Sequence, residues 1–168
     1  MNQKNLIGLN ACFMDLDDPL ELFKIWISEA EKKEINDPNA LSLATTNENK
    51  EPSARMVLLK GLSKKGFIFY TNLNSPKSFD LKKNPKAAMC FHWKSLQRQV
   101  RISGGVTQVT DEEADIYFDS RPYESRIGAW ASDQSKVMKK REEFLKKIDE
   151  FKKKYKDKKN LPRPKYWS

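Results

Sequence analysis

Residues 40–71 read ALSLATTNENKEPSARMVLLKGLSKKGFIFYT. Three short segments in this stretch are rich in β-branched, aromatic and other apolar residues, and turn-forming clusters at 47–52 and 63–66 separate them. This pattern predicts strands at Ala40–Thr46, Ala54–Lys60 and Phe67–Thr71. Because the connections are too short for a crossover helix, neighbouring strands are expected to run antiparallel.

Two further β-prone segments follow, at Ala87–Trp93 and Val100–Val109. Five closely spaced strands, joined mainly by tight turns, favour an antiparallel barrel over a parallel sheet. No linker or internal repeat divides the sequence, so a single domain over residues 1–168 is expected, with residues 1–14 as a flexible tail. The predicted fold class is therefore mainly β with flanking helices.

Three capping patterns predict helices around these strands. Each places an Asp, Ser or Thr before the first helical residue, and two of them add a Glu three positions later, as in a capping box. The predicted helices follow Asp18 with Pro19 and Glu21 and run to about Lys33, follow Ser75 with Pro76 and end near Asn84, and follow Thr110 with Glu113 over 114–119.

Composition excludes several classes of protein. The 168 residues are 38% hydrophobic and 11% aromatic, which is too rich in core-forming residues for a disordered chain. No apolar run approaches the roughly 20 residues of a membrane span, and the N-terminus lacks the long apolar core of a secretory signal. Cys12 and Cys90 are far apart and form no CxxC pattern, which favours a reduced, cytoplasmic location.

Positive charge is concentrated late in the chain. The formal net charge is +9, and the segment 136–159 alone contributes +7 from 12 Lys or Arg and five acidic residues. Apolar residues recur within it at mostly helical spacing, so a basic amphipathic helix is predicted over 136–159. These lysines are typical either of a solvated helix face or of a surface that binds a polyanion. Because no zinc spacing, glycine-rich RNA motif or helix-turn-helix accompanies them, no nucleic-acid partner is predicted.

Motifs for protein-derived catalysis are missing from the sequence. It contains no GxGxxG, no GxxxxGK[ST] and no GxSxG. His92 is the single histidine and lies in an apolar strand, so it is interpreted as a packed or rim residue, and no metal site is predicted. A cofactor is then expected to supply the reactive atom.

Cationic and hydroxyl-bearing residues gather at strand ends and turns. Arg55 and Lys60 flank an apolar strand, the run 70–72 reads YTN, and Ser75 and Lys77 open a helix. Fixed cations and hydroxyl donors near a helix N-terminus suit a phosphate-bearing ligand.

Several longer motifs occur in a fixed order: RMVLLK at 55–60, FYTN at 69–72, RQVRISG at 98–104, YFDSRP at 117–122 and IGAWASDQS at 127–135. DPLELFKIW at 18–26, DPNALSLATT at 37–46, NP at 84–85 and the terminal PRPKYW fit the same pattern. The residues and spacing of these motifs resemble those of the pyridoxine/pyridoxamine 5′-phosphate oxidase family from about Asp15 onward.

The resemblance implies an FMN-binding split β-barrel that forms a homodimer with the flavin at the subunit interface. The implied activity is FMN-dependent oxidation of pyridoxamine 5′-phosphate or pyridoxine 5′-phosphate to pyridoxal 5′-phosphate, by hydride transfer from substrate C4′ to flavin N5. O2 is the implied electron acceptor and yields hydrogen peroxide. The alternative is a non-catalytic or altered-specificity split barrel that binds FMN or pyridoxal phosphate. A basic interaction protein that uses the segment 136–159 is a third reading.

The same resemblance implies the site residues. No protein side chain is assigned the chemical step, because the flavin carries it. The implied FMN contacts are Arg55, Met56, Val57, Leu58, Leu59, Lys60, Tyr70, Thr71, Lys77, Gln99, Gln134 and Ser135. The implied substrate contacts are Lys60, Tyr117, Arg121 and Ser125. The last three fall four apart, which would align them if that stretch is helical.

Two departures from the family pattern lead to expectations. Pro76 stands where the family usually has an arginine in a Ser-Arg-Lys run, so weaker FMN binding is expected. The family normally continues for several tens of residues beyond the PRPKYW motif, with further flavin and substrate contacts, whereas this sequence stops at Ser168. A lower activity is the corresponding expectation.

Overall fold

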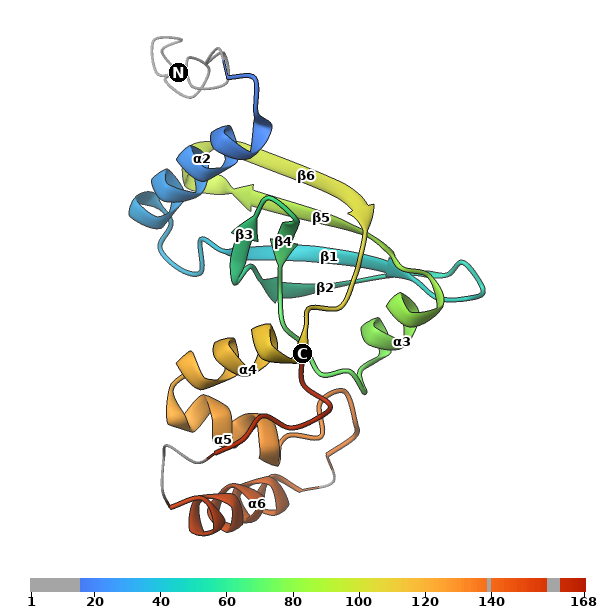
Figure 1. Ribbon diagram of the computed structural model, residues 1–168, viewed down its shortest axis with the longest axis vertical. Helices are drawn as coiled ribbons and strands as arrows, with labels where there is room; N and C mark the ends of the chain where they lie inside the picture. Colours follow the sequence, from blue (N-terminus) through green and yellow to red (C-terminus); the bar gives the residue numbers. More distant parts are fainter. Residues whose placement is uncertain (1–15, 139, 157–160) are drawn as a thin grey trace. The chain divides into compact units, whose positions relative to one another are not determined.

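The computed structural model describes residues 16–138, 140–156 and 161–168, so the predicted tail at 1–14 lies outside the described residues. The chain forms two compact units (Figure 1). The first comprises Met1–Thr45, Pro52–Phe69 and Lys86–Gly104, and the second comprises Thr46–Glu51, Tyr70–Pro85 and Gly105–Ser168. The organisation as a single domain stays a prediction.

The first unit opens with helix α2, Pro19–Lys33, as the capping pattern predicts. The Asp18 side chain accepts a hydrogen bond from the Leu20 amide at 2.8 Å and satisfies one of the free donors of the first turn. The reciprocal capping box is not formed, because the Glu21 carboxylate instead accepts from Lys24 Nζ at 2.6 Å. The Lys24 ammonium on the helix surface has therefore replaced the Asp18 amide as the donor to Glu21.

Four strands of the first unit form one sheet in the order β2-β1-β5-β6. Their bounds are β1 Ala40–Thr46, β2 Pro52–Leu58, β5 Lys86–Trp93 and β6 Arg98–Gly105. A second, two-stranded sheet pairs β3, Gly61–Ser63, with β4, Gly66–Ile68. The predicted antiparallel arrangement is confirmed for β1 with β5, where Leu43 lies opposite Met89. Strands β3 and β4 also pair antiparallel.

The strand bounds differ from the prediction in places. Strand β3 was not predicted, because its three residues stand directly beside a turn cluster. Strand β4 is shorter than Phe67–Thr71, and β6 begins and ends before the predicted Val100–Val109. A short 3-10 helix, Lys94–Leu96, joins β5 to β6, and Gln97 completes the turn in the left-handed conformation with φ of 52°.

The core of the first unit lies between helix α2 and one face of the larger sheet. Alternate residues of β1 and β5 are buried, as the period of two along a strand requires. The Phe23 ring of α2 packs edge-on against Phe67, with centroids 4.9 Å apart, and against Phe91 at 5.1 Å. Trp93 completes this cluster and donates its indole N–H to the Pro38 carbonyl at 2.7 Å.

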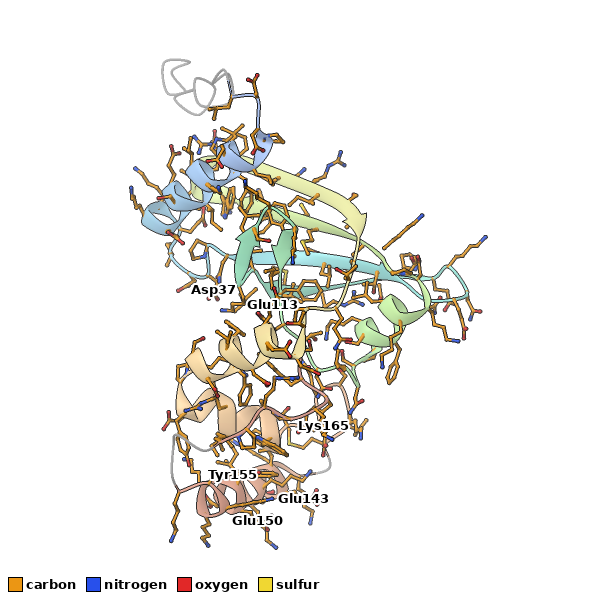
Figure 2. The ribbon with its side chains drawn as sticks, in the orientation of Figure 1. Asp37, Glu113, Glu143, Glu150, Tyr155 and Lys165 are labelled. Carbon is orange, nitrogen blue, oxygen red and sulfur yellow. The ribbon has the colours of Figure 1, made fainter. Side chains whose placement is uncertain are left out.

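The described residues of the second unit form four helices: α3 Pro76–Lys83, α4 Asp111–Ser120, α5 Tyr123–Ala131 and α6 Arg141–Lys154. The capping box predicted for α4 is confirmed: Thr110 Oγ1 accepts from the Glu113 amide at 3.2 Å, and the Glu113 carboxylate accepts from the Thr110 amide at 3.0 Å. Figure 2 labels Glu113 in the first turn of this helix.

The amphipathic helix predicted over 136–159 is shorter in the structure. Val137 is 96% exposed and precedes α6, and residues 157–159 lie outside the described residues. On the inner face of α6, the Phe151 ring lies 5.5 Å from Trp130 of α5. Tyr155, labelled just after α6 in Figure 2, accepts a hydrogen bond at its carbonyl from the Tyr123 hydroxyl at 2.9 Å. The helix is therefore held by an aromatic face, and its lysines are exposed.

The segment 166–168 pairs with the segment 71–73 in the manner of a short antiparallel ladder. The Thr71 amide donates to the Ser168 carbonyl at 2.6 Å, the Ser168 amide donates to the Thr71 carbonyl at 3.0 Å, and Asn72 and Trp167 form a β-bridge. Trp167 is thereby fixed in the second core with Phe118, Ile127 and Leu161. Among the described residues, no helix is long and apolar enough to cross a membrane.

Candidate functional site

Arg121 lies at the break between two helices. Helix α4 ends at Ser120, and Pro122 precedes the first residue of α5, so Tyr117 and Ser125 stand on different helices. The stretch is therefore not one helix, and the four-residue spacing does not align Tyr117, Arg121 and Ser125, because proline disfavours a helical conformation in the residue before it. The break instead places Arg121 over an aromatic ring, with its Cζ atom 4.7 Å from the centroid of Trp167.

The Arg121 guanidinium is partly buried, and none of the described carboxylates forms an ion pair with it. Within the described part of the chain, its Nη1 atom is buried and has no hydrogen-bond partner. Burial lowers the pKa of Arg121 below its ordinary value, and the nearby Tyr117 opposes this shift. Because an unpartnered buried donor is costly, an arginine in this state suits the binding of an anion.

Three aromatic rings lie nearly parallel beside Arg121. The centroids of Tyr70 and Tyr117 are 4.0 Å apart with an interplanar angle of 7°, and Tyr70 and Trp167 are 5.4 Å apart at 2°. Burial raises the pKa of both tyrosines above the ordinary value, and for Tyr70 the Glu113 carboxylate adds to the effect. Both phenols are therefore neutral at physiological pH and can donate a hydrogen bond.

Lys77 forms a second cationic group in the same unit. Its side chain lies in the first turn of α3 and only 7% of the residue is exposed. The ammonium donates to Thr71 Oγ1 at 3.1 Å and to Ser75 Oγ at 3.0 Å. The expected side-chain cap by Ser75 is not formed, because its hydroxyl donates to the Asn72 carbonyl at 2.7 Å. The structure thus brings together Thr71, Ser75 and Lys77, which suits an anion near a helix N-terminus.

The predicted FMN contacts at 55–60 lie in β2 and directly after it, within the first unit. Arg55 reaches back over the sheet: its Nη1 donates to Thr45 Oγ1 at 2.8 Å and to the Leu43 carbonyl at 3.1 Å, and its Nη2 donates to Ser53 Oγ. Met56 and Leu58 are exposed, Val57 is half-buried, Leu59 is buried and Lys60 is exposed. This alternation exposes every second side chain along the segment.

The three remaining predicted residues are Gln99, Gln134 and Ser135. Gln99 is exposed on β6 and lines an open pocket on the sheet, together with Ser42, Cys90 and Arg101. Gln134 and Ser135 are exposed in the turn after α5, and Ser135 has a positive φ of 66°. His92, predicted as a packed or rim residue, is exposed. The described residues hold no cluster of His, Cys, Asp and Glu that would bind a metal.

No role was assigned from the sequence to Trp167, which belongs to the stacked rings, or to Arg163, which contacts it. Both fall in the terminal PRPKYW motif, which carried the resemblance but indicated no contact. Arg163 Nε donates to Asp115 at 2.6 Å, Nη2 donates to Asp111 at 2.7 Å, and Nη1 donates to the Trp167 carbonyl at 2.6 Å. The motif therefore fixes the indole that lies beneath Arg121.

A model of the family described as "Pyridoxamine 5'-phosphate oxidase" matches residues 27–155 of this chain. The chain belongs to the pyridoxamine 5′-phosphate oxidase family. A pyridoxine/pyridoxamine 5′-phosphate oxidase from Pelagibacter ubique (strain HTCC1062) is 62% identical over 168 residues, which covers 100% of this chain and 81% of the relative. A protein of the same name from Sinorhizobium fredii is 54% identical over 156 residues, or 93% of this chain and 75% of the relative. The prediction of an enzyme of the oxidoreductase class is confirmed.

Two solved structures share the fold of this chain. A structure of PhzG from Burkholderia lata 383, in complex with tetrahydrophenazine-1-carboxylic acid, superposes with a TM-score of 0.84 at 26% identity and covers 92% of this chain and 75% of its own. A pyridoxamine 5′-phosphate oxidase-related, FMN binding protein from Nostoc punctiforme superposes with a TM-score of 0.62 at 17% identity, over 79% of this chain and 73% of its own. The predicted split-barrel fold class with flanking helices is confirmed.

Proposed function

We propose that this member of the pyridoxamine 5′-phosphate oxidase family oxidises pyridoxamine 5′-phosphate or pyridoxine 5′-phosphate to pyridoxal 5′-phosphate. FMN is the proposed cofactor and O2 the proposed electron acceptor, with release of hydrogen peroxide. The relatives that match most of the chain carry the name of this activity.

The observation that carries the proposal is the state of Arg121. Its Nη1 atom is buried without a hydrogen-bond partner in the described residues, and it lies beside a phenol that remains neutral and can donate. A substrate phosphate would supply the missing acceptor and the missing negative charge at once. Tyr117 and Arg121 are thus proposed to bind the substrate phosphate, with Ser125 and Lys60 as further contacts.

The donor set around Lys77 fits the phosphate of FMN. A buried ammonium between two hydroxyls, in the first turn of a helix, offers charge and hydrogen bonds to a dianion. FMN, when bound, accepts the hydride from the substrate. The further residues proposed to contact FMN are Arg55, Met56, Val57, Leu58, Leu59, Lys60, Tyr70, Thr71, Gln99, Gln134 and Ser135.

The remaining proposals concern the setting of the enzyme. A homodimer with FMN at the subunit interface is proposed from the family resemblance. A single domain is proposed because no linker or repeat divides the sequence, and a cytoplasmic location is proposed from the cysteine pattern. Neither a nucleic acid nor a membrane is a proposed partner. Sedimentation of the FMN-loaded protein tests the dimer, since a monomer that retains full flavin and activity would contradict it.

Turnover of the purified protein tests the function. FMN-loaded protein is mixed with pyridoxamine 5′-phosphate in air, and pyridoxal 5′-phosphate and hydrogen peroxide are measured together. The proposal predicts equal amounts of both products. A protein that retains flavin but forms neither product at any substrate concentration would instead support the non-catalytic or altered-specificity alternative. A protein that binds no flavin would support a different role, such as polyanion binding by α6.

A further inference from the structure

Two parts of the second unit that are far apart in sequence meet at Arg121. The guanidinium lies 4.7 Å from the Trp167 ring centroid and 5.7 Å from that of Phe118. A cation over an indole face is attracted by the ring, and the attraction grows as water is excluded. Trp167 is 9% exposed, so this contact lies in a largely dry environment. The indole is thus the described group best placed to restrict the guanidinium.

Trp167 is itself fixed by its backbone and by Arg163. Its carbonyl accepts from Arg163 Nη1, and Arg163 is anchored to Asp111 and Asp115, which lie one turn apart on α4. The Arg163 side chain is 7% exposed, so these ion pairs are shielded from solvent on the cation's side. Helix α4 therefore carries Arg121 at its end and holds Trp167 through its first two turns.

The aromatic neighbours hold the plane of the indole. Trp167 is nearly parallel to both Tyr70 and Tyr117, and the Phe118 ring lies edge-on to it at 5.2 Å. An indole held on this many sides cannot rotate without breaking several contacts. It therefore offers a fixed face on which a guanidinium can rest.

From these contacts we infer that Trp167 is a positioning residue, which acts through Arg121 to orient the guanidinium toward the phosphate of the substrate. The inference rests on the proposed function, because it takes the phosphorylated substrate as the ligand of Arg121. An arginine that is already oriented loses less conformational freedom when it binds an anion. The benefit is then to substrate binding rather than to the chemical step.

The experiment is a double-mutant cycle with two readouts. Trp167→Leu removes the aromatic face and keeps an apolar side chain, while Trp167→Phe keeps a smaller face. We expect Trp167→Leu to raise the KM for pyridoxamine 5′-phosphate roughly tenfold, with kcat within about twofold, and Trp167→Phe to raise the KM by less. The dissociation constant of pyridoxal 5′-phosphate, titrated without turnover, should rise in parallel.

Coupling to Arg121 separates positioning from loss of structure. In an Arg121→Ala background, Trp167→Leu should change neither readout further, because the group on which it acts is gone. Trp130→Phe is the matched control for Trp167→Phe. Trp130 packs in the same unit and donates its indole N–H to the Pro162 carbonyl at 2.8 Å. The Trp130→Phe variant should leave KM unchanged. Thermal unfolding of each variant shows whether it is folded.

Three results would overturn the inference: an unchanged KM and dissociation constant in both folded Trp167 variants, an equal effect of Trp167→Leu with and without Arg121, or an equal effect of Trp130→Phe. If Trp167→Leu does not fold, Trp167→Phe alone carries the comparison. A wild-type protein that binds pyridoxal 5′-phosphate without turning over its precursor would contradict the proposed oxidase but not the positioning role. A wild-type protein that binds neither would overturn both.

Discussion

The rings of Tyr70 and Tyr117 stack with centroids 4.0 Å apart and an interplanar angle of 7°. Tyr70 was assigned to FMN and Tyr117 to the substrate, so the stack joins a proposed cofactor contact to a proposed substrate contact. Positioning of the two ligands relative to one another is what an enzyme of this kind needs most, because the cofactor supplies the chemistry.

Tyr117 allows the ring and the hydroxyl to be tested separately. Tyr117→Phe keeps the stack, so it should leave the unfolding temperature unchanged and raise the KM about 2- to 10-fold through loss of one hydrogen bond. Tyr117→Ala removes the ring as well and should lower the free energy of unfolding by about 2 kcal/mol. Denaturant unfolding and steady-state kinetics check both. An equal loss of stability in the two variants would show that the stack contributes nothing.

Arg121→Ala should raise the KM for pyridoxamine 5′-phosphate roughly 10- to 100-fold, the size expected for a charged hydrogen bond. The FMN content of the purified protein should stay unchanged, since Arg121 is assigned to the substrate. Arg141→Ala, the same change at the exposed start of α6, is the matched control and should alter neither quantity. Loss of flavin from Arg121→Ala would refute the assignment.

Lys77→Met is expected to show the reverse pattern. Removal of the ammonium that contacts Thr71 and Ser75 should weaken FMN binding about tenfold or more, measured by flavin fluorescence during titration of apoprotein. The KM of fully FMN-loaded protein should change little. Lys82→Met alters an exposed lysine of the same helix and serves as the control. An unchanged FMN affinity in Lys77→Met would exclude this lysine from the cofactor site.

Pro76 is exposed at the first position of α3, next to the proposed phosphate site. Pro76→Arg should tighten FMN binding about two- to fivefold at low salt, the size of an exposed ion pair. The gain should disappear at high salt, because exposed charges are screened. Pro76→Ala adds no charge and should show no such gain. A salt-independent gain in both variants would point to helix geometry instead of charge.

The raised pKa values of Tyr70 and Tyr117 predict a pH dependence of stability. Each phenol ionises more easily in the unfolded chain than in the folded protein, so the folded state binds more protons above the ordinary tyrosine pKa of about 10. The free energy of unfolding should therefore fall as the pH rises through about 10. Tyr70→Phe should make this fall shallower in denaturant titrations at several alkaline pH values. An unchanged slope would mean that this phenol does not contribute.

Local features of the sequence predicted most of the elements. Helix α2, the α4 capping box and strand β1 depend on neighbouring residues, so pattern and spacing sufficed. Strand β3 was missed because three residues beside a turn carry no period. The four-residue spacing of Tyr117, Arg121 and Ser125 would align them only within one helix, and the helix is broken before Pro122.

The site was predictable only in part. Family motifs named Tyr70, Tyr117 and Arg121, but nothing in the sequence indicated that their side chains meet at Trp167. That contact depends on the pairing of 166–168 with 71–73, which joins residues almost a hundred positions apart. Non-local pairings of this kind are set by packing of the whole unit and leave no local pattern.

The most direct test of the proposed function is anaerobic reduction of the flavin by substrate. FMN-loaded protein is mixed with pyridoxamine 5′-phosphate in the absence of O2, and the visible absorption band of the flavin is followed. The account predicts that the band bleaches, that pyridoxal 5′-phosphate forms in an amount equal to the flavin, and that admission of air restores the colour. A band that persists at saturating substrate, in protein that holds its flavin, would contradict the assignment as an oxidase.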